Sequence, residues 1–226
     1  MAQTETGRDL AAIYDYRFSE AERLAKRQIW EVLCREFFQQ FVPPDSTILD
    51  LACGFGEFSS FIKAKRKFAV DMNPEVKRYL PPEVTFWNSS ADSLSMLPDN
   101  EIDVCFTSNF FEHLPSKSVM NSVLGEVKRV LKPSGRFVAL QPNIRYVSKE
   151  YWDFYDHYTP LSHLSCAEGF AKAGFEIERL IPRFLPYTTK SRLPQSPALV
   201  SAYLKVPLMW KLLGKQFVIV GRKPLL

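Results

Sequence analysis

The feature that most constrains the fold is an apolar segment that enters a glycine-containing turn and is followed by a second apolar segment ending on an acid. The first segment covers residues 48–58 (ILDLACGFGEF) and the second covers residues 68–74 (FAVDMNP). Short apolar runs separated by a helical stretch indicate two buried parallel strands joined by a crossover helix. The turn and the acid then lie at one edge of a sheet, where open α/β folds bind ligands.

The residues of this turn favour a nucleoside over a dinucleotide. Gly54 and Gly56 permit backbone angles and close approach that a Cβ would block. Asp71 lies where a carboxylate accepts hydrogen bonds from ribose hydroxyls. A dinucleotide site needs a third glycine so that a pyrophosphate can rest on the helix N-terminus, but Ser59 occupies that position. Glu57 in the first helical turn would also repel an anion, so a nucleoside without phosphates suits the site better.

The segment from Asp50 to Gly56 resembles motif I of the class I S-adenosylmethionine-dependent methyltransferases, in which an acid precedes alternating glycines. Ala52 replaces the first glycine of that motif. Further likenesses follow in the family's order. Residues 84–92 resemble the third strand and the acid after it, residues 102–109 resemble motif IV, and residues 130–138 resemble the helix, Pro-Gly turn and fifth strand.

The resemblance implies one α/β domain over residues 1–226, with a Rossmann-like, seven-stranded, mostly parallel sheet and helices on both faces. Its parts would be an N-terminal cap helix (1–45), a cofactor-binding core (46–142) and an acceptor-side half (143–226). A lid (182–215) would lie between the last two strands, with the seventh strand antiparallel to the sixth. Apolar periodicity places strands near 47–51, 67–71, 84–87, 102–107, 136–140, 175–181 and 216–221, and helices near 19–41, 117–131 and 166–173.

The same resemblance implies S-adenosyl-L-methionine as the cofactor and S-adenosyl-L-homocysteine as its product. In the family an acid after the third strand binds the adenine amine, and an N-terminal tyrosine or arginine touches the methionine carboxylate. Asn109 and Glu112 would line the methionine side. The residues assigned to the cofactor are Asp50, Ala52, Cys53, Gly54, Gly56, Asp71, Met72, Asn73, Ala91, Asp92, Ser108, Asn109, Tyr16 and Arg17. For the N-terminal pair, capping of the core is an equal alternative.

Residues 143–165 carry two of the three histidines and follow the fifth strand, on the side expected to bind the acceptor. A base of near-neutral pKa can take the proton of a hydroxyl acceptor as the new bond forms. His157, beside Asp156, is the first candidate, and His163 is the second. The alternative is that either histidine only hydrogen-bonds the backbone of a loop. His113, after motif IV, is expected to orient its turn.

Metal-site and compartment expectations follow from the scattered cysteines and histidines. Neither residue type shows ligand spacing, so no metal site is predicted. The same scatter of cysteines favours free thiols in a reducing compartment. Residues 1–8 lack an apolar leader, and no apolar run is long enough to cross a bilayer. A cytoplasmic location is therefore expected.

Basic charge is concentrated late in the chain. The formal net charge is +4, yet residues 179–226 contain no acidic side chain. This favours an anionic acceptor or surface. Residues 198–213 are apolar and interrupted by lysines, which indicates either an ordinary packed lid or peripheral membrane contact. Nucleic-acid binding is not expected, because glycines and aromatics are not interleaved with the basic residues. The oligomeric state is not indicated.

These observations predict an S-adenosylmethionine-dependent methyltransferase that acts on a small or polymer-attached acceptor. A loose resemblance of residues 143–163 to bacterial methyltransferases of saccharide or secondary-metabolite pathways favours a sugar or glycolipid hydroxyl. An amine or carboxylate acceptor stays open. The alternative is a catalytically silent methyltransferase-like protein that binds the cofactor or a partner. A nicotinamide-dependent oxidoreductase is disfavoured by Ser59 and by the missing Tyr-x-x-x-Lys pair of the short-chain enzymes.

Overall fold

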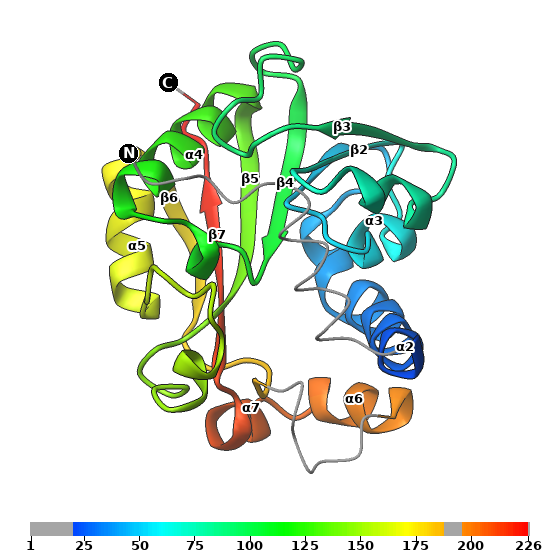
Figure 1. Cartoon of the computed structure of the whole chain (residues 1–226), viewed down its shortest axis with the longest axis vertical. Coiled ribbons are helices and arrows are strands. Elements are labelled where there is room, and N and C mark those ends of the chain that lie inside the picture. The colour runs from blue at the N-terminus through cyan, green and yellow to red at the C-terminus, as the bar shows by residue number, and fades with distance from the viewer. Residues whose placement is uncertain (1–19, 188–195, 226) are drawn as a thin grey trace.

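The computed structural model describes residues 20–187 and 196–225, which form an α/β fold around a seven-stranded sheet (Figure 1). The sheet order is β3-β2-β1-β4-β5-β7-β6. Strands β1 to β5 pair in parallel, whereas β7 is antiparallel to both β5 and β6. The strands are β1 (Thr47–Leu51), β2 (Arg66–Asp71), β3 (Val84–Asn88), β4 (Ile102–Ser108), β5 (Leu131–Pro142), β6 (Glu176–Ile181) and β7 (Gln216–Arg222). The predicted fold class and the antiparallel seventh strand are confirmed.

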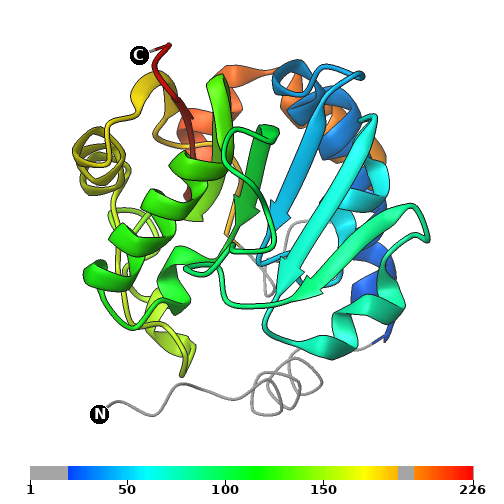
Figure 2. The ribbon, with the colours of Figure 1, turned by 90° about the horizontal axis from the view of Figure 1, so that it is seen from above.

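Helices cover both faces of the sheet, as the view from above shows (Figure 2). The α-helices are α2 (Glu20–Glu36), α3 (Glu57–Phe61), α4 (Lys117–Val130), α5 (His163–Lys172), α6 (Pro197–Leu204) and α7 (Pro207–Leu213). The 3-10 helices are η1 (Phe38–Phe41), η2 (Pro74–Tyr79), η3 (Phe111–His113) and η4 (Glu150–Asp153). Among the described residues, no helix combines the length and apolar character needed to span a membrane.

The core has two large layers because the central strands send alternate side chains to opposite faces. Within β4, Val104 and Phe106 pack in the layer under α2, α3 and α6, whereas Cys105 packs in the layer under α4 and α5. Both faces of these strands are therefore apolar, as buried parallel strands require. This arrangement holds the carboxyl ends of β1, β2 and β4 side by side.

Several predicted boundaries are corrected by the structure. The helix predicted over 19–41 is interrupted at Phe37, whose φ of −128° is not helical, and the chain continues as η1. The helix predicted from Cys166 begins earlier, at His163, because Ser162 and Ser165 form a capping box. The fifth strand also begins before its predicted start, because residues from Leu131 onward already pair with β4.

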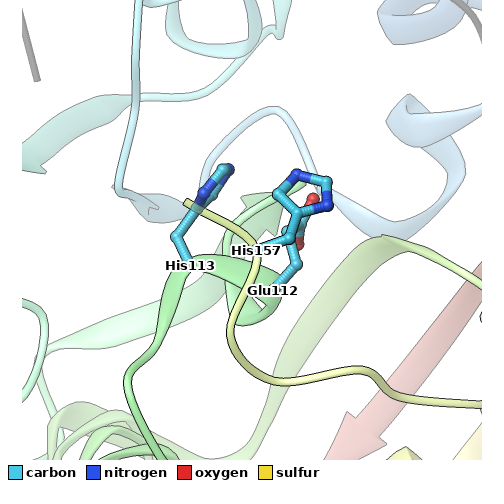
Figure 3. A group of neighbouring side chains, drawn as sticks. All are labelled: Glu112, His113 and His157. Atoms are coloured by element: carbon cyan, nitrogen blue, oxygen red, sulfur yellow. The ribbon is translucent and has the colours of Figure 1, made fainter. Parts of the chain in front are cut away.

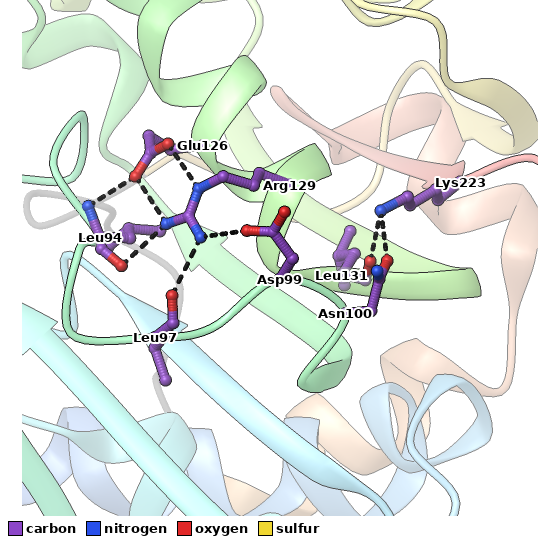
Figure 4. Close-up of polar contacts among 8 residues, drawn as sticks. All are labelled: Leu94, Leu97, Asp99, Asn100, Glu126, Arg129, Leu131 and Lys223. Carbon is purple, nitrogen blue, oxygen red and sulfur yellow. Dashed lines mark hydrogen bonds and ion pairs between the residues drawn. The ribbon is translucent and has the colours of Figure 1, made fainter.

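At the amino ends of the strands, Arg129 on α4 fastens the segment that leads into β4 (Figure 4). Its guanidinium donates to the carboxylates of Glu126 and Asp99 and to the carbonyl oxygens of Leu94 and Leu97, at 2.7–3.0 Å. Arginine can make such a network because its donors are fixed in one plane. This network lies at the opposite edge of the sheet from the glycine turn.

The lid region contains two short helices, α6 and α7. The hydroxyl of Tyr203 donates to the carbonyl of Phe184 at 2.5 Å, and the indole of Trp210 donates to the carbonyl of Tyr203 at 3.0 Å. Leu208 and Leu212 on α7 are more than 60% exposed. The predicted division into a cap helix, a cofactor core and an acceptor-side half stays a prediction.

The basic residues of the C-terminal part are largely used inside the fold. Arg183 donates to the carbonyls of Gly214 and Leu212, and Lys215 pairs with Glu150. Arg222 pairs with Glu176 at 2.8 Å, and Lys223 donates to Leu131 and Asn100. Much of the cationic charge expected to face an acceptor therefore stabilises the protein itself. Lys190 and Arg192, which contributed to that expectation, lie outside the described residues.

Candidate active site

The turn after β1 adopts backbone angles that favour glycine. Ala52, Gly54 and Gly56 have φ values of 54°, 53° and 69°, all in the left-handed region. A Cβ on Gly56 would lie 2.2 Å from Leu80 Cδ2, so a side chain here would require Leu80 to move in addition to adopting a strained φ. Ala52 adopts a conformation that costs an alanine about 1–2 kcal/mol. The alternating small residues of the predicted motif thus follow from the path of the chain.

Asp71 at the end of β2 is bonded to this turn. One carboxylate oxygen accepts from the backbone N–H of Gly54 and the other from that of Asn73, both at 2.9 Å. Burial raises the pKa of Asp71, and these backbone bonds oppose the rise. A carboxylate offers about four acceptor positions. Asp71 therefore braces the glycine turn and keeps capacity for further donors, as a ribose site requires.

Asp50, the acid of the predicted motif, is buried beneath the turn. It is 2% exposed, and one carboxylate oxygen accepts from the N–H and hydroxyl of Ser59 at 3.1 and 2.5 Å. Burial, the largest cause, raises the pKa of Asp50 to about 7. Asp50 thus lies beneath the turn and supports α3.

The other predicted cofactor residues lie at the same edge in varied settings. Asn73 caps η2 by accepting from the N–H of Glu75 at 3.0 Å, and Asp92 accepts from the hydroxyl of Ser90. Asn109, with φ of 47°, follows β4 and accepts from Gln216 at 3.4 Å. Cys53 and Ala91 are buried, Ser108 is half-buried and Met72 is 40% exposed. Tyr16 and Arg17 lie outside the described residues. These assignments stay predictions.

In the part of the chain predicted to bind the acceptor, the carboxylate of Asp156 contacts His113. An oxygen of Asp156 and its own backbone carbonyl both lie 3.0 Å from His113 Nδ1. Burial tends to lower the pKa of His113, but the hydrogen bond that His113 donates to the Asp156 carboxylate and the charge of Glu112 outweigh it, so the pKa is raised. His113, which was expected to orient its turn, thus contacts Asp156, the carboxylate that was predicted to act with His157.

His157 packs among aromatic rings beside this pair. Its ring stacks on Phe154 with centroids 4.7 Å apart and lies 4.6 Å from Tyr151 and 5.0 Å from His113. Glu112, His113 and His157 offer ligand atoms that all lie within 4.8 Å of one another (Figure 3). No metal site was predicted because the histidines are dispersed in the sequence. In the fold, two of the three histidines, His113 and His157, lie close together.

His163, the second catalytic candidate, lies apart from this group at the start of α5. Its Nδ1 is 2.9 Å from the amide nitrogen of Asn143. Burial, with a smaller contribution from Arg145, lowers the pKa of His163. The described contacts therefore tie His163 to the end of β5.

Gln141 is a buried polar residue near the end of β5 that was not among the residues predicted for the site. Its side-chain oxygen accepts from the N–H groups of Phe110 and Phe111 at 3.1 and 3.2 Å, which orients the turn that carries Glu112. A glutamine inside an otherwise apolar strand was the available signal, because buried polar side chains need partners. The buried hydroxyl of Tyr151 lacks a hydrogen-bond partner among the described residues and lines the same small hollow as Gln141 and Glu112.

Comparisons with known proteins agree with this geometry. Residues 49–139 match a family model described as a methyltransferase domain. The 2-methyl-6-phytyl-1,4-hydroquinone methyltransferase of Synechocystis is 31% identical over 123 residues, which are 50% of this chain and 38% of the relative. The demethylmenaquinone methyltransferase of Symbiobacterium thermophilum is 29% identical over 148 residues, 58% of each chain. The chain therefore spans less than two thirds of these curated relatives.

Solved structures show the same fold. A SAM-dependent methyltransferase from Archaeoglobus fulgidus matches with a TM-score of 0.66 and 19% identity, covering 87% of this chain and 94% of its own. A chain from the complex of the Haloferax volcanii Trm112 methyltransferase activator with a methyltransferase matches with a TM-score of 0.68 and 18% identity. That match covers 94% of this chain and 97% of the other. The predicted fold is confirmed, and the family model matches most of the part predicted to bind the cofactor.

Proposed function

We propose that this chain, whose residues 49–139 match a methyltransferase-domain model, is a class I S-adenosylmethionine-dependent methyltransferase that transfers the methyl group to an aromatic acceptor of the hydroquinone class. The observation that carries this proposal is the glycine turn joined to Asp71 by the hydrogen bond from the Gly54 N–H at 2.9 Å. The turn brings backbone close to a ligand, and the carboxylate retains acceptor capacity for ribose hydroxyls. The predicted cofactor agrees with the family.

The acceptor class rests on two supports. Both curated relatives are named for quinone-type acceptors, one of which carries a phytyl group, a hydrocarbon chain. In this chain, the rings of Tyr151 and Phe154 pack around His157. Aromatic side chains gathered in this way favour contact with a further flat aromatic ring, such as that of a hydroquinone. The exposed leucines of α7 would also suit an apolar tail or a lipid surface.

The cofactor supplies an activated methyl group on a sulfonium when it is bound. The chain's own residues position the acceptor and exclude water, which provides much of the acceleration in such a displacement. A hydroxyl of the acceptor must lose its proton, whether the methyl group goes to oxygen or to an adjacent ring carbon. We place this proton transfer at the cluster of Glu112, His113, Asp156 and His157, where Asp156 is a positioning residue for His113.

A sugar or glycolipid hydroxyl is the second candidate acceptor. Trp152 and Tyr155, which follow the buried Tyr151 in the chain, are 60% and 88% exposed. Exposed rings offer apolar faces on which the carbon-hydrogen face of a sugar can pack. A catalytically silent protein that binds the cofactor or a partner is the alternative from another class.

The cofactor half is tested by calorimetric titration of the full chain with S-adenosylmethionine and, in parallel, with NAD. We expect binding of the first and none of the second. Asp71→Ala should weaken S-adenosylmethionine binding by about a hundredfold, since it removes ribose contacts and the bond to Gly54 together. Unchanged affinity in this variant would contradict the role of Asp71.

The acceptor half is tested by transfer of an isotopically labelled methyl group to a panel of alkylated hydroquinones and of glycosides. Labelled hydroquinone products support the proposal, and the position of the label distinguishes oxygen from carbon. Labelled glycosides alone would favour the second candidate. Cofactor binding without any labelled product across the panel would favour the silent protein.

A further inference from the structure

Glu112, His113 and His157 bring a carboxylate and two imidazoles to one point at the carboxyl edge of the sheet (Figure 3). From this geometry we propose that these three side chains bind one divalent transition-metal cation. One carboxylate with two histidines is a recurring ligand set of catalytic zinc sites and of mononuclear iron sites. Glu112 and His113 come from η3, and His157 comes from the loop after η4.

The spacing of the group allows one ion to contact all three side chains after a small rearrangement. The three ligand atoms lie within 4.8 Å of one another. Bonds to zinc are about 2.0–2.2 Å for nitrogen and oxygen, so two ligand atoms of a tetrahedral site lie about 3.4 Å apart. The atoms must therefore approach one another by up to about 1.4 Å, which rotation about the side-chain bonds can supply.

Backbone contacts hold the two ligand-bearing segments together. The N–H groups of Tyr158 and Thr159 donate to the carbonyl of Glu112 at 2.7 and 3.1 Å, and the hydroxyl of Thr159 donates to the carbonyl of Leu114 at 2.6 Å. The loop that carries His157 is thus fastened to the turn that carries Glu112 and His113. The ligand set is assembled before any ion arrives, which lowers the cost of binding.

A second layer of contacts orients the imidazoles. The carboxylate of Asp156 lies 3.0 Å from His113 Nδ1, which favours the tautomer with hydrogen on Nδ1 and a lone pair on Nε2. A carboxylate behind a ligating histidine is the usual arrangement in metal sites. The ring of His157 is held by stacking on Phe154. Both histidines are therefore oriented by groups that need not bind the ion themselves.

The surroundings of the three side chains let a cation enter from solvent and limit competition from other strong metal ligands. The side chain of His113 is 28% exposed, which gives an ion a path to the group from solvent. All four cysteines are buried in the core, so no thiol on the surface competes for a soft cation. The role of the ion rests on the proposed function: a cation here would bind an acceptor oxygen and stabilise its deprotonated form.

The experiment measures binding alone, without cofactor or acceptor. The untagged full chain is stripped with a chelator and titrated with Zn²⁺, and separately with Mn²⁺, by calorimetry, and bound metal is counted by elemental analysis. We expect about one cation per chain. Glu112→Gln and His157→Phe, which keep the shape of the side chain and remove a ligand atom, should weaken binding by on the order of a hundredfold. Asp156→Asn, a change behind the ligand, should weaken it about tenfold.

His163→Gln is the matched control, because it removes the one histidine outside the group and should leave affinity unchanged. Circular dichroism establishes that each variant folds. Absence of stoichiometric binding to the wild-type chain would overturn the proposal, as would equal binding by Glu112→Gln, His157→Phe and the wild type. Methyl transfer by a stripped, metal-free protein would also overturn the role of the ion while leaving the proposed methyltransferase activity intact.

Discussion

The two edges of the sheet hold negative charge in opposite ways. At the amino edge, carboxylates pair with cations of the chain. Glu126 and Asp99 both pair with Arg129 (Figure 4), and Asp103 pairs with Lys132 at 2.8 Å. The hydrogen bond from Arg129 is the largest cause that lowers the pKa of Glu126. The chain supplies both signs of charge at this edge.

At the carboxyl edge, the carboxylates of Asp50 and Asp71 accept from backbone N–H groups and a serine hydroxyl. Burial raises the pKa of both. Glu112 is likewise buried, beside two histidines. The carboxylates at the amino edge are therefore paired with cations of the chain, whereas Asp50 and Asp71 at the carboxyl edge accept from uncharged donors. We expect substitutions at the amino edge to lower stability and substitutions at the carboxyl edge to lower function, because the proposed cofactor and metal ion would bind there.

The largest effect on function is expected at the carboxyl edge. His157→Ala should reduce turnover by on the order of a hundredfold, since it removes a group placed to assist proton transfer. Affinity for S-adenosylmethionine should stay near that of the wild type, because His157 lies on the acceptor side. His157→Phe should behave like the alanine variant while retaining the stacked ring. Full activity in both variants would leave His157 with a packing role only.

The largest effect on stability is expected at the amino edge. Arg129→Met keeps the length of the side chain but leaves two carbonyls and two carboxylates without their donor. We expect the free energy of unfolding to fall by about 2–3 kcal/mol, measured by urea denaturation. Turnover per folded molecule should be unchanged. If Arg129→Met lost turnover while keeping the stability of the wild type, the amino edge would have a role in function and the proposed difference between the two edges would be wrong.

Asp50, at the carboxyl edge, is expected to make the free energy of unfolding depend on pH. Its pKa is raised to about 7 in the folded protein, above the ordinary value of 3.8. Between these values the folded state binds more protons than the unfolded state, so Asp50 makes stability fall as pH rises, by at most about 1.4 kcal/mol per pH unit. Asp50→Asn retains an acceptor for Ser59 and removes the charge.

The asparagine variant should therefore gain stability relative to the wild type as pH rises from 4 to 7, the window set by that pKa. Urea denaturation at four pH values measures this difference. A constant difference across the window would mean that Asp50 does not titrate there.

The smallest effect concerns the backbone of the glycine turn. Ala52→Gly should stabilise the chain by about 0.5 kcal/mol, because relief of the left-handed strain exceeds the added entropy of the unfolded state. Ala139→Gly in the buried part of β5 is the control and should destabilise it. Destabilisation by Ala52→Gly would show that its methyl group contributes packing that outweighs the strain.

The cofactor edge could be predicted from the sequence because its residues are close together in the chain. Gly54 and Gly56 follow Asp50 within one turn, and Asp71 ends the next strand, so parallel pairing brings them together. The part predicted to bind the acceptor was harder to predict from the sequence. Asp156 and His157 are neighbours in sequence, and adjacency suggested a pair. In the structure, the carboxylate of Asp156 also contacts His113, more than forty residues away, and no local pattern predicts that contact.

Local sequence periodicity also fails to predict where a helix ends when contacts with distant residues determine that end. The periodicity of residues 19–41 continues through Phe37, but the structure breaks the helix there so that Phe37 stacks on Phe184, with ring centroids 4.0 Å apart. Phe184 comes from the lid region, and no pattern within the first helix contains that information. Gln141 was missed for the same reason, because its partners lie in the turn after β4.

The position of β7 has a consequence for biosynthesis. This strand, Gln216–Arg222, inserts between β5 and β6 and is buried along nearly its whole length. On the ribosome, β5 and β6 are made long before it, and each then exposes an open strand edge. Such edges invite pairing with other chains. The nascent protein must therefore keep two unpaired strands from aggregating until Gln216–Arg222 emerges from the exit tunnel and closes the sheet.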